Sequence, residues 1–430
     1  MFNMKTPTLG IVSVLAGLLL SQSVISQSAL AQPQSLDRGK PVATVAAQLF
    51  SLQGSTAKQA LAADTLVASL AQDASVVSTD AIALNAALLD GATSALLVAF
   101  GPGRTYSIEQ SRSYWINPEY QAWTGKVDVG ALSKGRNKQV NRAVFVRSEN
   151  NVFGQINIDG RTFEIMTTEA GKHLLVERDF SQLGVQDDTP ALELPTLMDT
   201  AKISVGEVNM VAPTVIRLLQ VTSSNALSRF GTSNMVARMN FFLAQANDVY
   251  ANNGVPIVLQ DAGKYSSGRT ELSSVTANTI AIRAPNDGYL DQFAGSLRNS
   301  TGADLVGHIT DNSGDGLCGR VNAIGGGQSN GFFVTRYICT NFTFVHEIGH
   351  LFGARHDNDP TTTPFAFGHG FVNSGRNFRT VMAVSSNPQP RIGFFSTDDQ
   401  TFNGGALGNS SFSDNERVHV LRRNTMAGFR

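Results

Sequence analysis

A run of three histidines and one glutamate around residue 350 constrains this chain more than any other feature of its sequence. The run is His346-Glu347-Ile348-Gly349-His350-Leu351-Phe352-Gly353-Ala354-Arg355-His356-Asp357. Residues four apart share one face of a helix, so the imidazoles of His346 and His350 can reach a single cation. Gly353 can take the left-handed conformation that ends a helix, and the chain can then turn back to bring in His356. Three neutral imidazoles leave one position on a zinc ion open for water, which is the arrangement of a catalytic site.

Glu347 is the predicted general base of this site. It follows the first histidine directly, so its carboxylate can contact a water on the cation. Zinc lowers the pKa of that water while a carboxylate takes the proton. The alternative is an amphipathic helix with surface histidines. With 7 His and 34 Asp+Glu in the chain, the full string has a chance frequency below about one in a million. Glu416 is the only glutamate after Glu347, which makes His356 the better third ligand.

The first 31 residues predict export. Lys5 is the only charged side chain before an apolar run from Leu9 to Leu20, which is long enough for a signal peptide and too short for a membrane span. Ala29-Leu30-Ala31 then fits the small-x-small cleavage rule. An N-terminal anchor helix is the alternative, but no stop-transfer flank follows. We therefore expect a secreted or periplasmic protein with no membrane anchor once residues 1–31 are removed.

Composition excludes several classes of function. The chain has 33 Lys+Arg against 34 Asp+Glu, so its charge gives no argument for nucleic acid or an anionic membrane as partner. A hydrophobic fraction of 42% excludes wholesale disorder. Two cysteines cannot build a disulfide scaffold or a cysteine-based zinc cluster, although they can form one bridge.

The N-terminal region, residues 32–205, is predicted to be a mixed domain, helical and then β-rich. Residues 41 to about 100 are rich in Ala and Leu and indicate amphipathic helices, including a buried one over 81–100. Between 115 and 177, short β-like runs alternate with turns, and Asp159-Gly160-Arg161 predicts a hairpin. The polar, Pro-bearing segment 186–195 indicates the start of a linker.

The C-terminal region, residues 206–430, has the alternation of strands and helices that favours an α/β fold with a mostly parallel, twisted sheet. The predicted strands are 214–222, 255–260, 303–310, 317–324 and 331–338. One predicted helix is capped by Ser233 and stopped by Gly254. Leu290, Phe293 and Leu297 mark a second, shorter helix.

At this point the sequence resembles a known family. The histidine string, followed by Met382 in Arg379-Thr380-Val381-Met382-Ala383, resembles the metzincin metallopeptidases. Asp357 after the third histidine makes it look like the reprolysin (adamalysin) branch. The chain is most similar there to bacterial reprolysin-like enzymes, including peptidyl-Asp metalloendopeptidases. The similarity covers roughly residues 212–430.

The resemblance implies a metzincin-like fold with one zinc ion held by the three histidines. It also implies that Glu347 is general base and then proton donor. Met382 would form the hydrophobic base of the site without being a ligand, and Asp357 would bond locally and fix the loop after the third histidine. An antiparallel edge strand, about 317–324, would pair with an extended polypeptide substrate.

The cysteines depart from the family pattern. No cysteine precedes Cys318, so a propeptide thiolate cannot cap the zinc, and Val384 follows the Met-turn without the cysteine that many relatives carry there. Cys318 and Cys339 are predicted to form a disulfide beside the zinc helix. Two reduced thiols are the alternative, which export disfavours.

Several other residues near the zinc motif have two interpretations. Arg379 and Arg391 flank the Met-turn, in the segment that walls the S1′ pocket of metzincins. One of them could pair with an Asp side chain at P1′, or both could hold this loop to the domain. His369 fits a turn or supporting role better than zinc ligation, and His419 looks like a surface residue. Calcium is not excluded, but no spaced motif organises the available acids, which are Asp311, Asp315, Asp398 and Asp399.

The sequence thus predicts a secreted zinc endopeptidase that hydrolyses proteins, with a preference for Asp at P1′. A non-catalytic exported zinc protein and a zinc hydrolase of small amides are the alternatives. Residues 32–205 are predicted to be a prodomain that assists folding or blocks the cleft. A permanent substrate- or surface-binding domain is the other interpretation.

Overall fold

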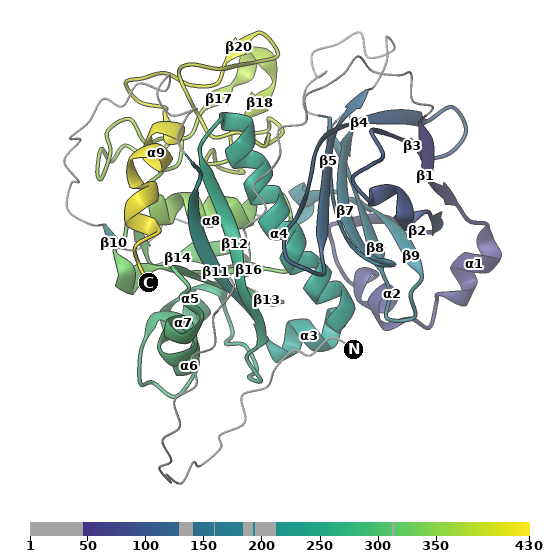
Figure 1. Cartoon of the computed structure of the whole chain (residues 1–430), viewed down its shortest axis with the longest axis horizontal. Coiled ribbons are helices and arrows are strands. Elements are labelled where there is room, and N and C mark those ends of the chain that lie inside the picture. The colour runs from purple at the N-terminus through teal and green to yellow at the C-terminus, as the bar shows by residue number, and fades with distance from the viewer. Residues whose placement is uncertain (1–45, 129–140, 159, 184–191, 194–211, 312–313) are drawn as a thin grey trace, which may run out of the picture.

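The computed structural model of the chain describes residues 46–128, 141–158, 160–183, 192–193, 212–311 and 314–430. The predicted signal peptide, the domain boundary near residue 205 and most of the predicted linker lie outside these residues. Figure 1 shows two halves side by side, a barrel of strands in purple and blue and an α/β half in teal to yellow. Within the described residues, no helix is long and apolar enough to span a membrane.

The first half is a closed barrel with strand order β1-β2-β9-β8-β7-β6-β5-β4-β3. Neighbouring strands run antiparallel, except that β1 pairs with β3 in parallel. Its interior is apolar, with Trp123 and Phe145 fully buried. Its strands are β1 (Ala47–Leu52), β2 (Val76–Leu84), β3 (Ala95–Ala99), β4 (Thr105–Trp115), β5 (Gln121–Asp128), β6 (Arg142–Ser148), β7 (Asn151–Ile158), β8 (Arg161–Thr167) and β9 (His173–Arg178). The short helices are α1 (Ser55–Ala60), α2 (Thr65–Leu70), η1 (Ala86–Leu89) and η2 (Phe180–Leu183).

The prediction of amphipathic helices over residues 41–100 is wrong for most of that range. The segment 81–100 holds the end of β2, the turn η1 and the strand β3. Leu96 and Val98 face the barrel interior while Leu97 between them is only partly buried, which is the period-2 pattern of a strand. Because β2 and β3 are hydrogen-bonded on both sides, barrel pairing outweighs the helix propensity of Ala and Leu.

The second half contains a five-stranded sheet, β12-β11-β13-β16-β14. Its pairs are parallel except for the last, in which β14 runs antiparallel to β16 at the edge. The expectation of an α/β catalytic half is confirmed. The strands are β11 (Thr214–Thr222), β12 (Ile257–Ser266), β13 (Leu305–Thr310), β14 (Gly319–Val321) and β16 (Phe332–Arg336).

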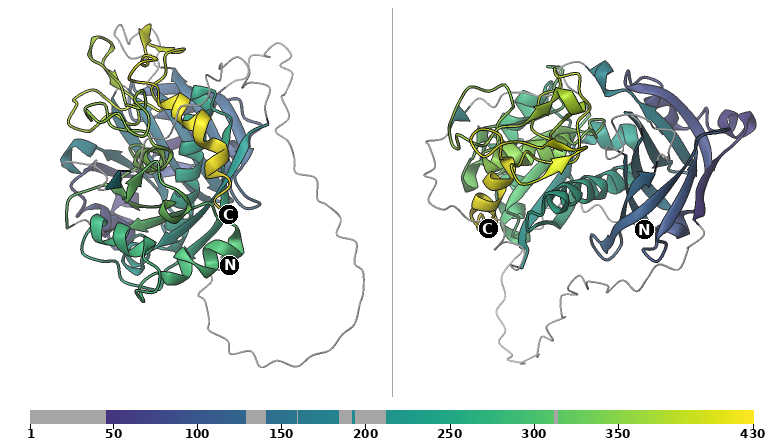
Figure 2. Two further views of the ribbon diagram at one scale, coloured as in Figure 1. Left: turned by 90° about the vertical axis from the view of Figure 1, so that its left-hand side faces the viewer. Right: turned by 90° about the horizontal axis from the view of Figure 1, so that it is seen from above.

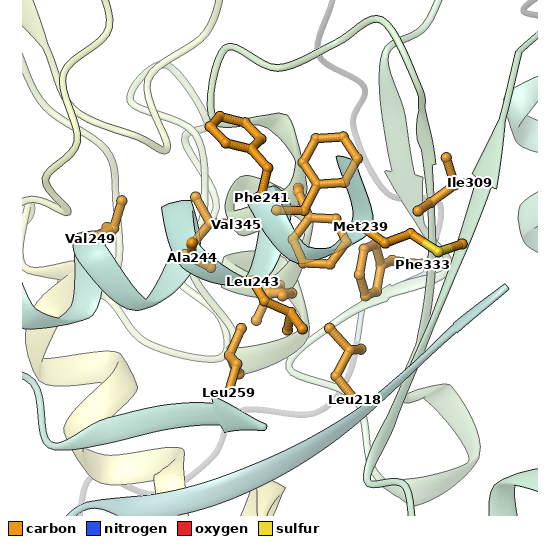
Figure 3. Close-up of a cluster of buried hydrophobic side chains, with 14 of the residues drawn as sticks. Leu218, Met239, Phe241, Leu243, Ala244, Val249, Leu259, Ile309, Phe333 and Val345 are labelled. Atoms are coloured by element: carbon orange, nitrogen blue, oxygen red, sulfur yellow. The ribbon is translucent and has the colours of Figure 1, made fainter. Parts of the chain in front are cut away.

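Helices cover both faces of this sheet. The helices α4 (Thr232–Asn253) and α8 (Thr343–Phe352) pack on one face, and Figure 3 shows Leu218, Leu243 and Phe333 in the apolar layer between them and the strands. On the other face lie α5 (Val275–Arg283), α6 (Asp291–Ala294) and α7 (Ser296–Thr301). The remaining elements are β10 (Leu192–Glu193), α3 (Ser224–Phe230), β15 (Ala323–Ile324), η4 (Gln328–Asn330), β17 (Val372–Asn373), η5 (Ser374–Arg376), β18 (Phe378–Arg379), β19 (Thr401–Phe402), β20 (Gly405–Ala406) and α9 (Asn415–Met426).

The long helix α4 differs from its prediction at one end. It stops at Gly254, which takes the left-handed conformation as expected. Its N-cap position, however, is Gly231 rather than Ser233. Ser233 instead donates its backbone N–H to Glu169 of the barrel at 2.9 Å, so a carboxylate from the other half satisfies this end of the helix.

Helix α4 stands between the two halves of the molecule, as Figure 2 shows. Of its 22 residues, 17 are buried, because one side packs on the sheet and the other on barrel strands. Phe241 meets Phe153 of the barrel with ring centroids 4.8 Å apart. Arg238 lies 3.9 Å from the Phe153 ring and 4.2 Å from the Tyr337 ring. The outer face of the barrel and the α/β half therefore share one continuous core, separate from the barrel interior.

Buried charges cross the same contact. Glu164 of the barrel accepts hydrogen bonds from Arg178 at 2.9 Å, from Arg238 of α4 at 3.3 Å and from the Thr340 hydroxyl at 2.5 Å. Burial alone would raise the pKa of Glu164, but Arg238 and Arg178 hold it below its usual value. Removing one member of such a group leaves the others as uncompensated buried charges.

Candidate active site

The three histidines of the motif converge on one point. His346 and His350 lie on α8, all of which is buried, and His356 follows after the helix has ended. The three Nε2 atoms are 3.1 Å from one another. In a tetrahedral zinc site with ~2.0–2.1 Å bonds, neighbouring nitrogens are about 3.3 Å apart. Among the described residues this is the only group of three or more His, Cys, Asp or Glu side chains whose ligand atoms could hold a metal ion.

Backbone carbonyls orient two of these rings. The Nδ1 of His346 lies 2.8 Å from the carbonyl oxygen of Val381, and the Nδ1 of His350 lies 2.8 Å from that of Ala354. A carbonyl accepts only, so each Nδ1 carries the proton and each Nε2 presents a lone pair to the common point. The donor set therefore fits a zinc ion.

Two glycines make the local fold of α8 possible. Gly353 ends the helix with φ of 110° and donates its N–H to the carbonyls of Gly349 and His350. Gly349 lies against the Met-turn, and a Cβ there would be 2.5 Å from the sulfur of Met382. The fully buried Met382 thus packs directly under the zinc helix.

Glu347 lies between the zinc helix and the edge of the sheet. Its side chain is 2% exposed and faces Gly319 on β14, where a Cβ would be 2.5 Å from its Oε1. Only a glycine at position 319 leaves room for this carboxylate. Cys318 precedes that glycine and is joined to Cys339, so the predicted disulfide is confirmed.

Asp357 acts over a longer range than expected. Its two carboxylate oxygens accept from the backbone N–H of Val384 at 2.9 Å and from the side chain of Asn387 at 3.0 Å. These partners are 27 and 30 residues further along the chain, so the expectation of a local bond is wrong. The contact instead ties the loop of the third histidine to the segment after Met382.

Comparisons with known proteins agree with this geometry. Residues 212–396 match the model of metallopeptidase family M12. A peptidyl-Asp metalloendopeptidase of Stenotrophomonas maltophilia (strain R551-3) is 34% identical over 310 residues, which cover 70% of this chain and 73% of that protein. A protein of the same name from Xanthomonas campestris pv. campestris (strain ATCC 33913) is 31% identical over 339 residues, 76% of this chain and 80% of that protein.

The chain belongs to metallopeptidase family M12. The resemblance to a reprolysin-type enzyme is thereby confirmed, and the chain is a zinc metalloendopeptidase. Among solved structures, metalloproteinase-II from Bacteroides fragilis aligns with a TM-score of 0.41 and 11% identity over 76% of this chain and 90% of that one.

The two arginines beside the Met-turn of this M12 peptidase bind backbone carbonyls. Arg379 donates to Ala383 at 2.5 Å and to Gln389 at 2.9 Å. Arg391 donates to the same Ala383 carbonyl at 2.9 Å and to Asn341 at 3.1 Å. Both side chains are buried. This arrangement favours the interpretation in which they hold the loop to the domain.

The other histidines near the motif stay apart from the zinc centre. His369 stacks on Phe412 with centroids 3.9 Å apart, and its ring nitrogens contact the carbonyls of Phe412 and Thr361. His419 is fully buried against Phe395, so its assignment to the surface is wrong. Burial lowers the pKa of His419 to about 4.

Sequence reasoning missed Gly319 and the inward side of α9. The one available signal for Gly319 was its position next to Cys318.

The acids considered for calcium divide into two groups. Asp311 pairs with Arg229 at 2.7 Å, and Asp315 accepts from the first backbone N–H groups of α5. Asp398 and Asp399 lie elsewhere, on the exposed loop after Thr397.

Proposed function

We propose that this peptidase is exported and cleaves extended polypeptides at the zinc centre, with the three histidines of the motif as ligands and Glu347 as general base. The observation that carries the proposal is the convergence of three Nε2 atoms at 3.1 Å beside a buried glutamate. Zinc supplies Lewis acidity that polarises the scissile carbonyl and lowers the pKa of a water. Glu347 takes the proton from the attacking water and then passes it to the leaving amine.

The edge of the sheet supports the binding of an extended chain. Among the strands that the structure describes, β14 pairs with β16 alone, and it carries Gly319 against Glu347. Just beyond it, β15 pairs in parallel with β10, where Leu192 is opposite Ala323 and Glu193 is opposite Ile324. A segment of this chain thus already adds a strand beside this edge, which is how a peptide substrate would bind.

The same pairing supports a prodomain role for residues 32–205. β10 follows the barrel in sequence and pairs with β15. β15 comes directly after β14, the edge strand on which we propose that the substrate binds. A segment held there competes with a peptide substrate without needing a thiol on the zinc. Mass spectrometry of the secreted protein tests this: a mature N-terminus near residue 200 is expected, and retention of the barrel in the active protein would contradict it.

A preference for Asp at P1′ is the substrate class we propose. Its support is the printed name of the M12 relatives, peptidyl-Asp metalloendopeptidase. Cleavage of an unstructured protein such as casein, followed by sequencing of the new N-termini, measures the preference directly. New N-termini that begin with Asp are expected, and a random distribution of first residues would contradict the preference.

Replacing Glu347 by Ala tests the mechanism. Hydrolysis of casein should fall at least about 10²-fold because the general base is lost. Zinc content, measured by atomic absorption, should stay at one ion per chain, since Glu347 is not a ligand. The exposed Asp287, in the α/β half, offers the control Asp287→Ala, which should keep full activity. Retained proteolysis in Glu347→Ala would overturn the proposed role.

A further inference from the structure

Arg320 is a charged residue of the edge strand that takes no part in the proposed mechanism. It lies in the middle of β14, between Gly319, which faces Glu347, and Val321, which is buried in the same apolar cluster as the zinc helix. Unlike these two neighbours, Arg320 is only partly buried. A cationic side chain on the strand that would pair with a peptide can also contact the side chains of that peptide.

The side chain of Arg320 leaves β14 on the face of the sheet opposite to the zinc helix. Successive side chains of a strand alternate between faces, and Gly319 and Val321 both lie on the side of α8. In the register of the sheet, Arg320 is opposite Val334 of β16. Val334 packs in the cluster on the other face, with Val275 of α5. Because directly opposed residues share a face, Arg320 lies on the α5 side.

The charge of Arg320 is close enough to the zinc centre to interact with Glu347. Burial lowers the pKa of Arg320, and the negative charge of Glu347 opposes this shift. A guanidinium group carries five N–H donors in a planar fork that matches the two oxygens of a carboxylate. Arg320 therefore presents a carboxylate-binding group near the place where the peptide bond would be cut.

Three other arginines near the zinc centre are bound within the protein. Arg379 and Arg391 both donate to the carbonyl of Ala383 beside the Met-turn. Arg355 binds the carboxylate of its own loop at 2.6 Å. All three are buried, whereas Arg320 is not. Of these four arginines, Arg320 is thus the one that a substrate side chain can reach without displacing the surrounding protein.

We propose that Arg320 selects substrates that carry an acidic side chain next to the P1′ residue, at P1 or at P2′. This inference rests on the proposed function, in which an extended substrate pairs with β14. With the P1′ side chain in a pocket beside the Met-turn, the side chains of P1 and P2′ point to the opposite face, because an extended chain alternates. Arg320 lies on that face, and a carboxylate there forms a charge-assisted hydrogen bond with its guanidinium.

Four peptides measure this selection in the secreted, zinc-loaded enzyme. All four have Asp at P1′; one pair differs only by Glu or Gln at P1, and the other only by Glu or Gln at P2′. At one of these positions kcat/KM should be about tenfold higher for Glu, the contribution of one hydrogen bond between charged groups. Ratios of about one at both positions would overturn the proposal. Failure to cleave any of the four would contradict the proposed function itself.

Variants at position 320 assign the selection to one side chain. Arg320→Gln should reduce the Glu/Gln ratio to about one, whereas Arg320→Lys, which keeps the charge without the planar fork, should keep part of it. The exposed Arg269 offers the matched control Arg269→Gln, which should keep the full ratio. Each ratio compares two peptides on one enzyme, so a smaller active fraction cancels.

An unchanged ratio in Arg320→Gln would overturn the proposal. Equal losses of kcat/KM for the Glu and the Gln peptides leave the ratio unchanged, and they would show that Arg320 supports the fold or the reaction rather than selecting the substrate. Arg320→Lys carries the test if Arg320→Gln fails to fold, and a ratio equal to that of the parent would then count against the proposal.

Discussion

Single residues that are far apart in sequence make the contacts of the zinc centre. Gly319 leaves room for the Glu347 carboxylate, and Gly349 leaves room for the sulfur of Met382. The sequence predicted that the three imidazoles meet at one point, because their positions depend only on spacing along one helix and the turn after it. The glycine contacts could not be predicted, since they depend on which strand meets the helix. Four charged residues lie within four positions of His419, although its direct neighbours are valines, and this local charge favoured the wrong assignment to the surface.

Gly319→Ala should impair catalysis without removing zinc. The new methyl group would come within 3 Å of the Glu347 side chain and displace the carboxylate. A shift of about 1 Å in a catalytic group can reduce kcat about 10²-fold. Steady-state proteolysis and zinc content measure the two effects separately.

Gly327→Ala is the matched control for that variant. A Cβ at this position meets no atom within 4 Å, and its φ of −88° suits any residue. This control should keep full activity. Normal turnover by Gly319→Ala would show that the glycine does not position the base.

Arg391→Ala should reduce cleavage before Asp and before Leu to the same extent. Its guanidinium holds the carbonyls of Ala383 and Asn341, so its loss loosens the loop for every substrate. Values of kcat/KM for two peptides that differ only at P1′ measure this. The exposed Arg376, replaced by Ala, serves as the control. A loss confined to the Asp peptide would instead assign Arg391 to substrate recognition.

At the scale of elements, the sequence predicted the positions of the strands in the α/β half more accurately than those in the barrel. The expected strand 214–222 has the observed bounds of β11, because apolar residues predominate in its sequence and its last five residues are buried. In the barrel, Ala- and Leu-rich runs form strands whose partners are up to about a hundred residues away. Such distant pairing leaves little trace in the local sequence pattern. The helix propensity of Ala and Leu therefore led to the wrong prediction of helices there.

The disulfide joins two of these elements. Cys318 precedes the edge strand β14 and Cys339 precedes the zinc helix α8, with 21 residues of sequence separation. Replacing both by Ala in the Glu347→Ala background should lower the free energy of unfolding by about 3 kcal/mol. Urea denaturation measures the loss. A change below about 1 kcal/mol would show that packing alone fixes the edge strand.

At the scale of the whole molecule, buried histidines make stability depend on pH. His308 and His419 are fully buried, and burial lowers the pKa of each to about 4 from an ordinary value of 6.5. Below pH 6.5 the unfolded chain takes up protons that the folded chain does not. The stability that neutral burial contributes above pH 6.5 is therefore lost as pH falls toward 4.

The part of this pH-dependent loss of stability that comes from His308 can be measured separately. Each histidine should reduce the free energy of unfolding by about 1.4 kcal/mol per pH unit between pH 6.5 and 4. His308→Asn should remove one such contribution and flatten the pH dependence by that amount, while protonation of the zinc ligands affects parent and variant alike. Urea denaturation at several pH values measures the difference. Equal slopes in the two proteins would contradict the prediction.

Helix α4 packs on the sheet with one side and on the outer face of the barrel with the other, and this restricts how the two halves can be exchanged between relatives. A barrel moved from another protein brings its own counterparts of Phe153 and Glu164, and these must match Phe241 and Arg238 on the recipient helix. A chimera joined in the linker alone separates these partners, whereas one joined after α4 keeps them together.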